Sequence, residues 1–150
     1  MKIYVVRHGE TDWNNKRLIQ GLIDNPLNSK GVLQANEVSS FFQDLEIKKF
    51  YSSPLIRASK TLEIIKNNNN FDGEIILIDG FKERDFGSLE GKTVEEYLEL
   101  NNPEESVGYE KNEALERRVM KSFYSLLETK ENTLITAHAH VLKAILVNVD

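Results

Sequence analysis

The chain contains no cysteine among its 150 residues. A disulfide, a thiolate metal site and a cysteine nucleophile are therefore excluded. Basic residues are also in deficit, because 19 Lys and Arg stand against 24 Asp and Glu and leave a formal net charge of −5. Proteins that bind nucleic acid usually carry a basic surplus, so we expect no nucleic-acid partner. A basic pocket confined to one cleft remains compatible with this net charge.

Long apolar runs are absent as well. No segment approaches the ~18 apolar residues that cross a bilayer, and the apolar stretch at the N-terminus is too short for a secretory signal and is closed by Arg7. We therefore expect a cytoplasmic protein with no membrane partner. A chain of this length buries roughly 68–70% of the surface that its unfolded form exposes. With no linker or repeat in view, we expect a single domain over residues 1–150.

Short β-branched and aromatic runs alternate with longer segments of helical periodicity. Four such runs predict buried strands, at 3–6, 49–52, 75–78 and 133–136. The spacing of apolar residues predicts helices over 30–45, 55–66, 112–129 and 141–147. Ser53-Pro54 predicts the start of the second helix, with Ser53 as its N-cap. This alternation is typical of βαβ units, so we expect a three-layer α/β/α sandwich around a mainly parallel sheet.

Polar residues that follow the predicted strands are the main functional signal. Ligands of parallel α/β sheets bind at the carboxyl ends of the strands. All three histidines of the chain lie just beyond such an end, namely His8, His138 and His140. Taken alone, a histidine is more often an ordinary core or surface residue. Three of three at the expected ligand-binding edge indicate a shared site.

The residue types at these strand ends suit the transfer of a phosphoryl group to a side chain. Arg7 and Arg57 can each offer two parallel hydrogen bonds to phosphate oxygens. The neutral imidazole of His8 can attack phosphorus. A carboxyl group must protonate the departing oxygen, and Glu83 is the favoured candidate, for which a raised pKa would help. Gly9 is expected to leave space where the backbone passes close to the ligand, and a glycine there permits an unusual φ.

Each of these residues also has an ordinary explanation. The Arg7-His8 pair could form a surface turn, and Arg57 could be a solvated helix residue. Glu83 could belong to an exposed cluster of charges over residues 82–85. Glu10, one residue beyond Gly9, competes for the acid role. Only the joint arrangement favours a phosphoryl-transfer site.

Ordered motifs extend along most of the chain. Residues 7–14 read Arg-His-Gly-Glu-Thr-Asp-Trp-Asn, and matching positions follow at Arg17, Gln20-Gly21, Asp24, Pro26-Leu27, Gly31 and Gln34-Ala35. Further motifs are Ser52-Ser53-Pro54-Leu55-x-Arg57-Ala58-x-x-Thr61, then Glu83-x-x-Phe86-Gly87-x-x-Glu90-Gly91, and finally His138. In this order, over about residues 3 to 147, the sequence resembles the histidine phosphatase superfamily, also called phosphoglycerate mutase-like.

This resemblance implies a phosphoglycerate mutase-like fold and a role for each matching residue. His8 would be the phosphorylated nucleophile, and Glu83 would be the proton donor. The catalytic set would be completed by Arg7, Arg57 and His138. The residues that bind the phosphate or substrate would be Arg7, Asn14, Gln20, Gly21, Arg57 and His138. The resemblance implies no metal and no other cofactor.

The sequence departs from the family pattern in two places. It reads Ala137-His138-Ala139-His140 where the family usually has Ser-His-Gly-Gly. His140 would therefore narrow the pocket or contact the ligand, unless it caps the next helix or points to solvent. The sequence also ends at Asp150, where relatives commonly carry a further strand and tail. We expect either a compact member or a shortened C-terminus, which would leave an apolar helix face open and favour a homodimer.

The segment over residues 88–110 bears on the reaction type. It holds one basic residue, Lys92, and seven Glu, and it predicts a short helix near 93–100 with a loop around Pro103. A mutase must exclude water and hold a second anionic group while the substrate reorients. An acidic cap would repel phosphoglycerate and would favour a neutral or cationic leaving group.

We therefore predict a metal-independent phosphomonoester hydrolase that acts through phosphohistidine, with a small phosphate ester as its partner. Phosphoglycerate mutase-type transfer is the alternative within the same family. Two alternatives from other classes are a metal site formed by His8, His138 and His140, and a non-catalytic phosphate-binding module.

Overall fold

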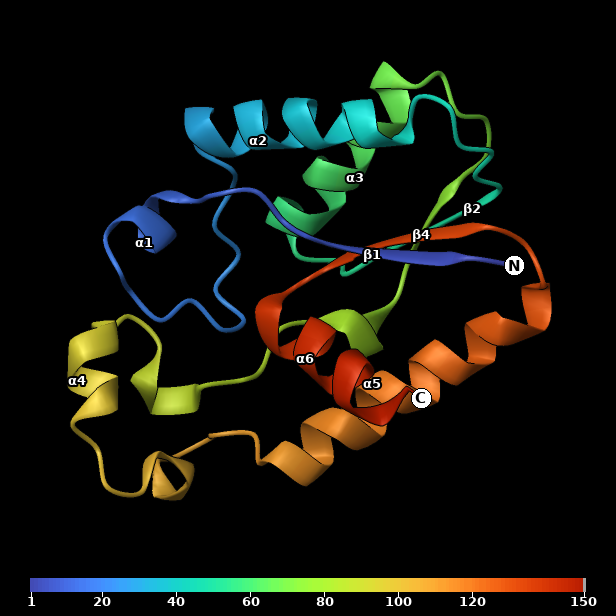
Figure 1. Cartoon of the computed structure of the whole chain (residues 1–150). Helices are drawn as coiled ribbons and strands as arrows, with labels where there is room; N and C mark the ends of the chain where they lie inside the picture. The colour runs from blue at the N-terminus through green and yellow to red at the C-terminus, as the bar shows by residue number, and fades with distance from the viewer. Residues whose placement is uncertain (150) are drawn as a thin grey trace.

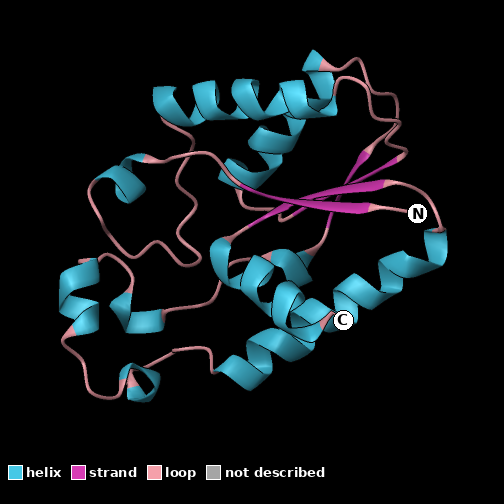
Figure 2. Cartoon of the chain, in the orientation of Figure 1, coloured by secondary structure: helices cyan, strands magenta, loops and turns pink. Residues whose placement is uncertain are grey.

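The computed structural model describes residues 1–149 and has three layers (Figure 1). Its central sheet has the order β1-β4-β2-β3, and all of its strand pairs are parallel. The strands are β1 (Ile3–Arg7), β2 (Lys49–Ser52), β3 (Ile75–Leu77) and β4 (Thr133–Ala137). Figure 2 shows them between two groups of helices. The predicted three-layer arrangement and mainly parallel sheet are confirmed. Asp150, where the sequence ends, lies outside the described residues.

Four helices cover the two faces of the sheet. On one face lie α2 (Ser29–Ser39), continued by a 3₁₀ turn, and α3 (Ile56–Asn68) (Figure 1). On the other lie α5 (Asn112–Leu126) and α6 (Ala139–Asn148). Each face has its own apolar cluster, and all five residues of β4 are buried between them. The uninterrupted apolar and β-branched sequence of this strand suits a position covered on both sides.

The short elements beside the sheet carry their own capping interactions. In α1 (Asp12–Asn15), which the sequence analysis did not predict, the hydroxyl of Thr11 accepts a hydrogen bond from the Asn14 amide, and the Asn14 side chain accepts one from the Thr11 amide. Thr93 and Glu96 repeat this arrangement at α4 (Val94–Leu98), inside the predicted short helix. Over residues 1–149 no helix is long and apolar enough to cross a membrane.

The predicted N-cap of α3 is wrong. The helix begins at Ile56, after Leu55 in an extended conformation, and no side chain of its N-cap residue caps it. The Ile56 amide donates instead to Asp24 Oδ1 at 2.7 Å, from a loop far away in sequence. The hydroxyl of Ser53 lies 2.8 Å from Nε2 of His138. The Ser53 hydroxyl still accepts a hydrogen bond from the Leu55 amide at 3.2 Å, just before the helix, and His138 is its second, long-range partner.

Hydrogen bonds of the sheet continue past its carboxyl ends and fix the residues that follow. The amide of His8 donates to the carbonyl of Ala137 at 3.0 Å, and the amide of Ser53 donates to that of Thr136 at 3.0 Å. The residues after β1 and β2 are thereby held on either side of the end of β4. The chain after β3 forms a 3₁₀ turn, Asp79–Phe81, and then leads to Glu83.

Candidate active site

His8 is held as a neutral imidazole with a defined tautomer. Its Nδ1 lies 2.6 Å from the carbonyl oxygen of Gly9, which can only accept a hydrogen bond, so Nδ1 carries the proton. The other ring nitrogen, Nε2, therefore keeps its lone pair. Burial lowers the pKa of His8 to about 4, and the charges of Arg57 and Arg7 act in the same direction, against the Gly9 hydrogen bond. At neutral pH the ring is uncharged, and the lone pair on Nε2 is available for chemistry.

Gly9 makes a close backbone contact that the sequence analysis did not predict. Its φ is not positive. A Cβ at this position would lie 2.4 Å from the carbonyl oxygen of Gly31 in α2. The Gly9 amide donates to Thr61 Oγ1 at 3.1 Å, and the Thr61 hydroxyl donates to the carbonyl of Arg57 at 2.8 Å. The missing side chain thus lets the loop behind His8 pack against helix backbone.

His138 stands beside His8 in a fully buried position. The two ring centroids are 5.1 Å apart. Burial places the pKa of His138 well below 6.5, and the nearby charge of Arg57 lowers it further, so this ring is neutral as well. Its Nε2 faces the hydroxyl of Ser53, while its buried Nδ1 has no hydrogen-bond partner in the described chain.

Arg57 places a buried positive charge next to both rings. Its two terminal nitrogens donate to the carbonyls of Ile23 and Gly21, each at 2.8 Å. Its buried Nε has no partner within residues 1–149. Burial lowers the pKa of this group, but a guanidinium stays charged in proteins. A buried charge with an unused donor is costly unless an anion completes it, which argues against a solvated helix residue.

The predicted phosphate-binding residues divide into two groups. Arg7 and Asn14 line a pocket of about 300 Å³ together with His8, Glu10 and Gln34. Arg7 is exposed, at the end of β1. The side-chain oxygen of Asn14 is occupied by the Thr11 amide.

Gln20 and Gly21 do not line this pocket. They contact residues next to it, Thr11 and Arg57 respectively. The side-chain oxygen of Gln20 receives hydrogen bonds from Thr11 Oγ1 at 2.7 Å and from Asn25 at 3.2 Å. Gly21 has a φ of +54° and supplies one of the carbonyls that hold Arg57. A Cβ on Gly21 would lie 2.0 Å from a carboxylate oxygen of Glu90. In the structure Gln20 therefore holds Thr11 in place, and Gly21 holds the Arg57 side chain in place.

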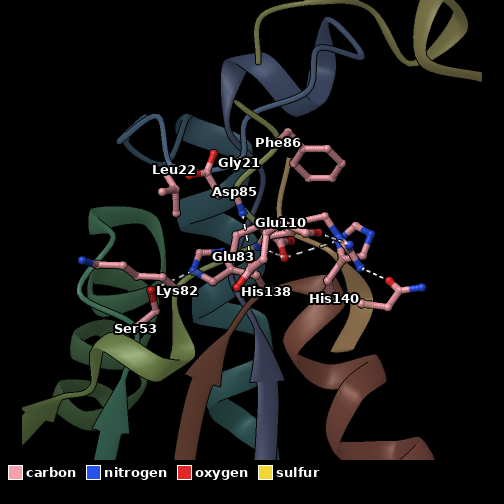
Figure 3. Close-up of polar contacts among 12 residues, drawn as sticks. Gly21, Leu22, Ser53, Lys82, Glu83, Asp85, Phe86, Glu110, His138 and His140 are labelled. Carbon is pink, nitrogen blue, oxygen red and sulfur yellow. Dashed lines mark hydrogen bonds and ion pairs between the residues drawn. The ribbon is translucent and has the colours of Figure 1, made fainter. Parts of the chain in front are cut away.

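Glu83 is buried in the loop between two 3₁₀ turns, and Figure 3 shows it with His138 and His140 above the ends of the strands. Its Oε1 accepts from the Arg84 amide at 2.8 Å and lies 3.3 Å from Nδ1 of His140. Burial acts to raise the pKa of Glu83, but His140, His138 and the Arg84 amide together outweigh it and hold this pKa at about 2, with His140 contributing most of the lowering. The expected raised pKa is thus absent in the empty site. An arriving phosphate dianion, a like charge, would raise it.

Glu10, the competing acid, is held differently. Its carboxylate accepts from Asn28 at 3.0 Å and lies 3.1 Å from Nζ of Lys30. The hydrogen bond from Asn28 is the main cause of a lowered pKa at this partly buried group. Glu10 lines the same pocket as His8, so its position alone does not remove it as a candidate.

Arg118 of α5 fixes the loop that carries Glu83, and the sequence analysis did not single it out. It donates to the carbonyls of Gly80, Lys82 and Glu83 at 2.8–2.9 Å. Its Nε also lies 2.6 Å from Glu110 Oε1. The sequence shows Arg118 only as a charged residue beside the apolar positions of the predicted helix. It could not show that Arg118 binds carbonyls 35 to 38 residues away in sequence.

His140 neither caps α6 nor points only to solvent. The N-cap of α6 is His138, and the Nδ1 of His140 faces Glu83. The ring of His140 also meets the ring of Phe86 edge-on, with the centroids 5.4 Å apart. Within residues 1–149 no three His, Asp or Glu side chains gather in a way that could hold a metal ion.

A neutral buried histidine, a buried arginine and a fixed carboxylate at one sheet edge are the expected geometry of the family suggested by the motifs. The sequence model of the histidine phosphatase superfamily (branch 1) matches residues 3–149. The chain belongs to this superfamily.

Relatives within the histidine phosphatase superfamily carry names of two kinds. The chain is 36% identical over 149 residues to the uncharacterized phosphatase PhoE of Bacillus subtilis, covering 98% of this chain and 76% of that protein. It is 39% identical over 99 residues to the probable phosphoglycerate mutase GpmB of Escherichia fergusonii, covering 66% of this chain and 45% of that protein. The crystal structure of a phosphoglycerate mutase from Bacillus anthracis shares the fold, with a TM-score of 0.87, 22% identity, and coverage of 99% of this chain and 79% of that one. The expected phosphoglycerate mutase-like fold is thereby confirmed.

Proposed function

We propose that this member of the superfamily hydrolyses phosphate monoesters of small metabolites through a phosphohistidine on His8, without a metal ion. The observation that carries the proposal is the tautomer of His8, because the Gly9 carbonyl binds Nδ1–H and leaves the lone pair on Nε2. Arg7, Arg57 and His138 surround this ring with charge and with hydrogen-bonding nitrogens. The unpartnered Nε of Arg57 suits a phosphate oxygen.

The reaction then has two balanced steps. In the first, Nε2 of His8 bonds to phosphorus, the ester P–O bond breaks, and the leaving oxygen takes a proton from Glu83. In the second, water bonds to the same phosphorus and gives its proton to Glu83 as the N–P bond breaks and inorganic phosphate forms. A carboxyl group that serves as acid and then as base is regenerated at the end of each cycle.

The segment 88–110 favours hydrolysis over mutase-type transfer. Four of its seven Glu have structural partners: Glu90 accepts from the Leu22 amide, Glu95 pairs with Arg17, Glu96 caps α4, and Glu110 pairs with Arg118. The other three, Glu99, Glu104 and Glu105, are exposed. The segment therefore offers excess negative charge and one lysine, which is a poor environment for the second anionic group of a phosphoglycerate. A neutral or cationic leaving group is the substrate class that this charge supports.

The decisive experiment is hydrolysis of para-nitrophenyl phosphate by the wild type and by His8→Ala, with excess chelator present. We expect turnover by the wild type alone. Undiminished turnover by His8→Ala would overturn the nucleophile assignment. Loss of wild-type turnover on chelation would overturn metal independence.

A panel of phosphate esters then separates the two candidate functions. The alternative, phosphoglycerate mutase-type transfer, is favoured by the likeness to GpmB. We expect esters with neutral or cationic leaving groups to be hydrolysed fastest. Preference for a phosphoglycerate or a bisphosphate, with phosphate returned to a second hydroxyl, would support the alternative. A protein that binds phosphate without turning over any ester would be a non-catalytic module.

A further inference from the structure

His140 occupies a position that the phosphohistidine chemistry does not use. It lies in the first turn of α6, two residues beyond His138, and its Nδ1 is 3.3 Å from Oε1 of Glu83. This nitrogen is buried and has no hydrogen-bond partner in the described chain, and Oε1 of Glu83, at 3.3 Å, is the polar atom beside it. Glu83 is therefore the group that it faces.

The two side chains differ in their access to water. The side chain of Glu83 is 11% exposed, whereas that of His140 is 36% exposed. His140 also lines a small cavity of about 90 Å³ between α5, α6 and the acid loop, the segment over residues 82–86 that carries Glu83. An imidazole is the side chain whose charge changes between pH 5 and 8. His140 can thus exchange protons with solvent, while the Glu83 carboxylate beside it is largely buried.

We propose that Glu83 and His140 share one proton, and that His140 supplies the proton that Glu83 delivers to the leaving oxygen. This inference rests on the proposed hydrolase function. In the empty site both ring nitrogens of His140 carry protons and Glu83 is ionised, so loss of the Nδ1 proton leaves a neutral ring that keeps its proton on Nε2. When the phosphate dianion enters, its negative charge favours the neutral carboxyl, so the N–H bond of His140 breaks and an O–H bond to Glu83 forms.

The remaining proton movements close the cycle. Glu83 gives its proton to the ester oxygen as the P–O bond breaks. In the hydrolytic step the attacking water loses a proton to Glu83, and this proton returns to Nδ1 of His140. His140 acts through Glu83 without contact to the reacting atoms, so it is a positioning residue.

Other charged groups face this pair from each neighbouring element. Around His140 these are Arg84 of the acid loop, Glu116 of α5 and Lys143 of α6. Around Glu83, the neutral rings of His8 and His138 and the charge of Arg57 belong to the phosphate site, and Arg118 binds the backbone carbonyl of Glu83. Among these groups only His140 combines a contact with the carboxylate and an opening to solvent.

The test compares His140→Asn with the wild type over a range of pH. An asparagine amide nitrogen can take the place of Nδ1 and donate to Glu83, but it does not titrate. For alkyl phosphates, whose leaving groups are poor, we expect the alkaline limb of kcat/KM to move to lower pH by about one pH unit or more, as for strongly coupled groups. With para-nitrophenyl phosphate, whose leaving group needs little protonation, we expect no such movement.

Two controls keep this inference separate from the proposed function. Lys143→Gln removes a positive charge from the same cavity, and we expect its alkaline limb to match that of the wild type. His8→Ala tests the nucleophile, so its undiminished activity would remove the hydrolase mechanism itself. Suppose that His8→Ala is inactive, so that the hydrolase mechanism holds. The shared-proton proposal is then wrong if His140→Asn keeps the wild-type alkaline limb of kcat/KM with alkyl phosphates, or if it slows both ester classes equally. Faster hydrolysis of alkyl phosphates by His140→Asn at neutral pH would overturn it too.

Discussion

Gly9 lies against Gly31 so closely that a Cβ on Gly9 would come within 2.4 Å of the Gly31 carbonyl oxygen. The relationship is reciprocal, because a Cβ on Gly31 would lie 2.1 Å from the carbonyl oxygen of Glu10. Two stretches of backbone, one leading away from His8 and one beginning α2, are thus in direct contact. The position of His8 depends on this contact as well as on the sheet.

We expect Gly9→Ala and Gly31→Ala to lower both stability and activity. Neither neighbour is a flexible side chain that can turn away, so the backbone must shift. Overpacking of this kind costs about 1–3 kcal/mol. Urea unfolding measures the loss of stability, and hydrolysis of para-nitrophenyl phosphate measures the displacement of His8. Wild-type stability and kcat in both variants would contradict the close packing.

The burial of His8 predicts a pH dependence of stability. Its pKa is about 4 in the folded protein and 6.5 in the unfolded chain, so between these values the unfolded state binds more protons. The free energy of unfolding therefore falls as pH falls from about 6.5 to 4, by about 3 kcal/mol from this group. His138 acts in the same sense. The low pKa of Glu83 also makes the free energy of unfolding fall as pH falls, but from 4.5 to about 2, which lies mostly below the range of His8.

His8→Asn tests this dependence, since asparagine can keep the hydrogen bond to the Gly9 carbonyl but carries no titrating ring. We expect a shallower fall of the free energy of unfolding between pH 6.5 and 4 than in the wild type, with the contribution of His138 retained. Equal slopes in urea unfolding of the two proteins would show that His8 is not held neutral by burial.

The assignment of the acid predicts a dependence on leaving groups. We expect Glu83→Gln to slow alkyl phosphates far more than para-nitrophenyl phosphate, because a good leaving group needs little protonation. Glu10→Gln is the matched control, and we expect it to slow the two esters to the same extent. A reversal of these patterns in kcat/KM would move the acid role to Glu10.

The carbonyl contacts of Arg118 predict that α5 controls the acid loop. We expect Arg118→Ala to lower stability by at least about 2 kcal/mol, since a hydrogen bond to a charged group contributes ~1.5–3 kcal/mol. We also expect a larger loss of kcat with alkyl phosphates than with para-nitrophenyl phosphate. Its exposed neighbour offers a control, and Arg117→Ala should match the wild type in both measurements. A stable Arg118→Ala protein with normal alkyl phosphatase activity would show that the acid loop keeps its conformation without the hydrogen bonds from Arg118.

The sequence predicted the parts of the site that follow from strand ends. His8, Arg7 and His138 could be placed together because parallel strands deliver their carboxyl ends to one edge, and the strands themselves were marked by short apolar runs. Predictions from local sequence failed where the partner of a side chain lies far away in the sequence. Ser53 was assigned to a helix but faces His138, and Asp24 took its place at the start of α3.

Electrostatic details could not be predicted for a similar reason. The lowered pKa of Glu83 depends on His140, which lies 57 residues away in sequence and reaches it only through packing of α6 against the acid loop. The clamp by Arg118 is equally non-local. Spacing and composition carry no information about which nitrogen of an imidazole meets which oxygen.

The chain has one tryptophan, Trp13, and it lies in α1, five residues after His8. A Cβ on Gly91, just before α4, would be in van der Waals contact with its ring at 3.6 Å. The indole therefore sits where the loop after the nucleophile meets the segment 88–110. We expect its intrinsic fluorescence to report on this junction, so titration of phosphate or vanadate into the unlabelled protein tests whether anion binding changes it without turnover.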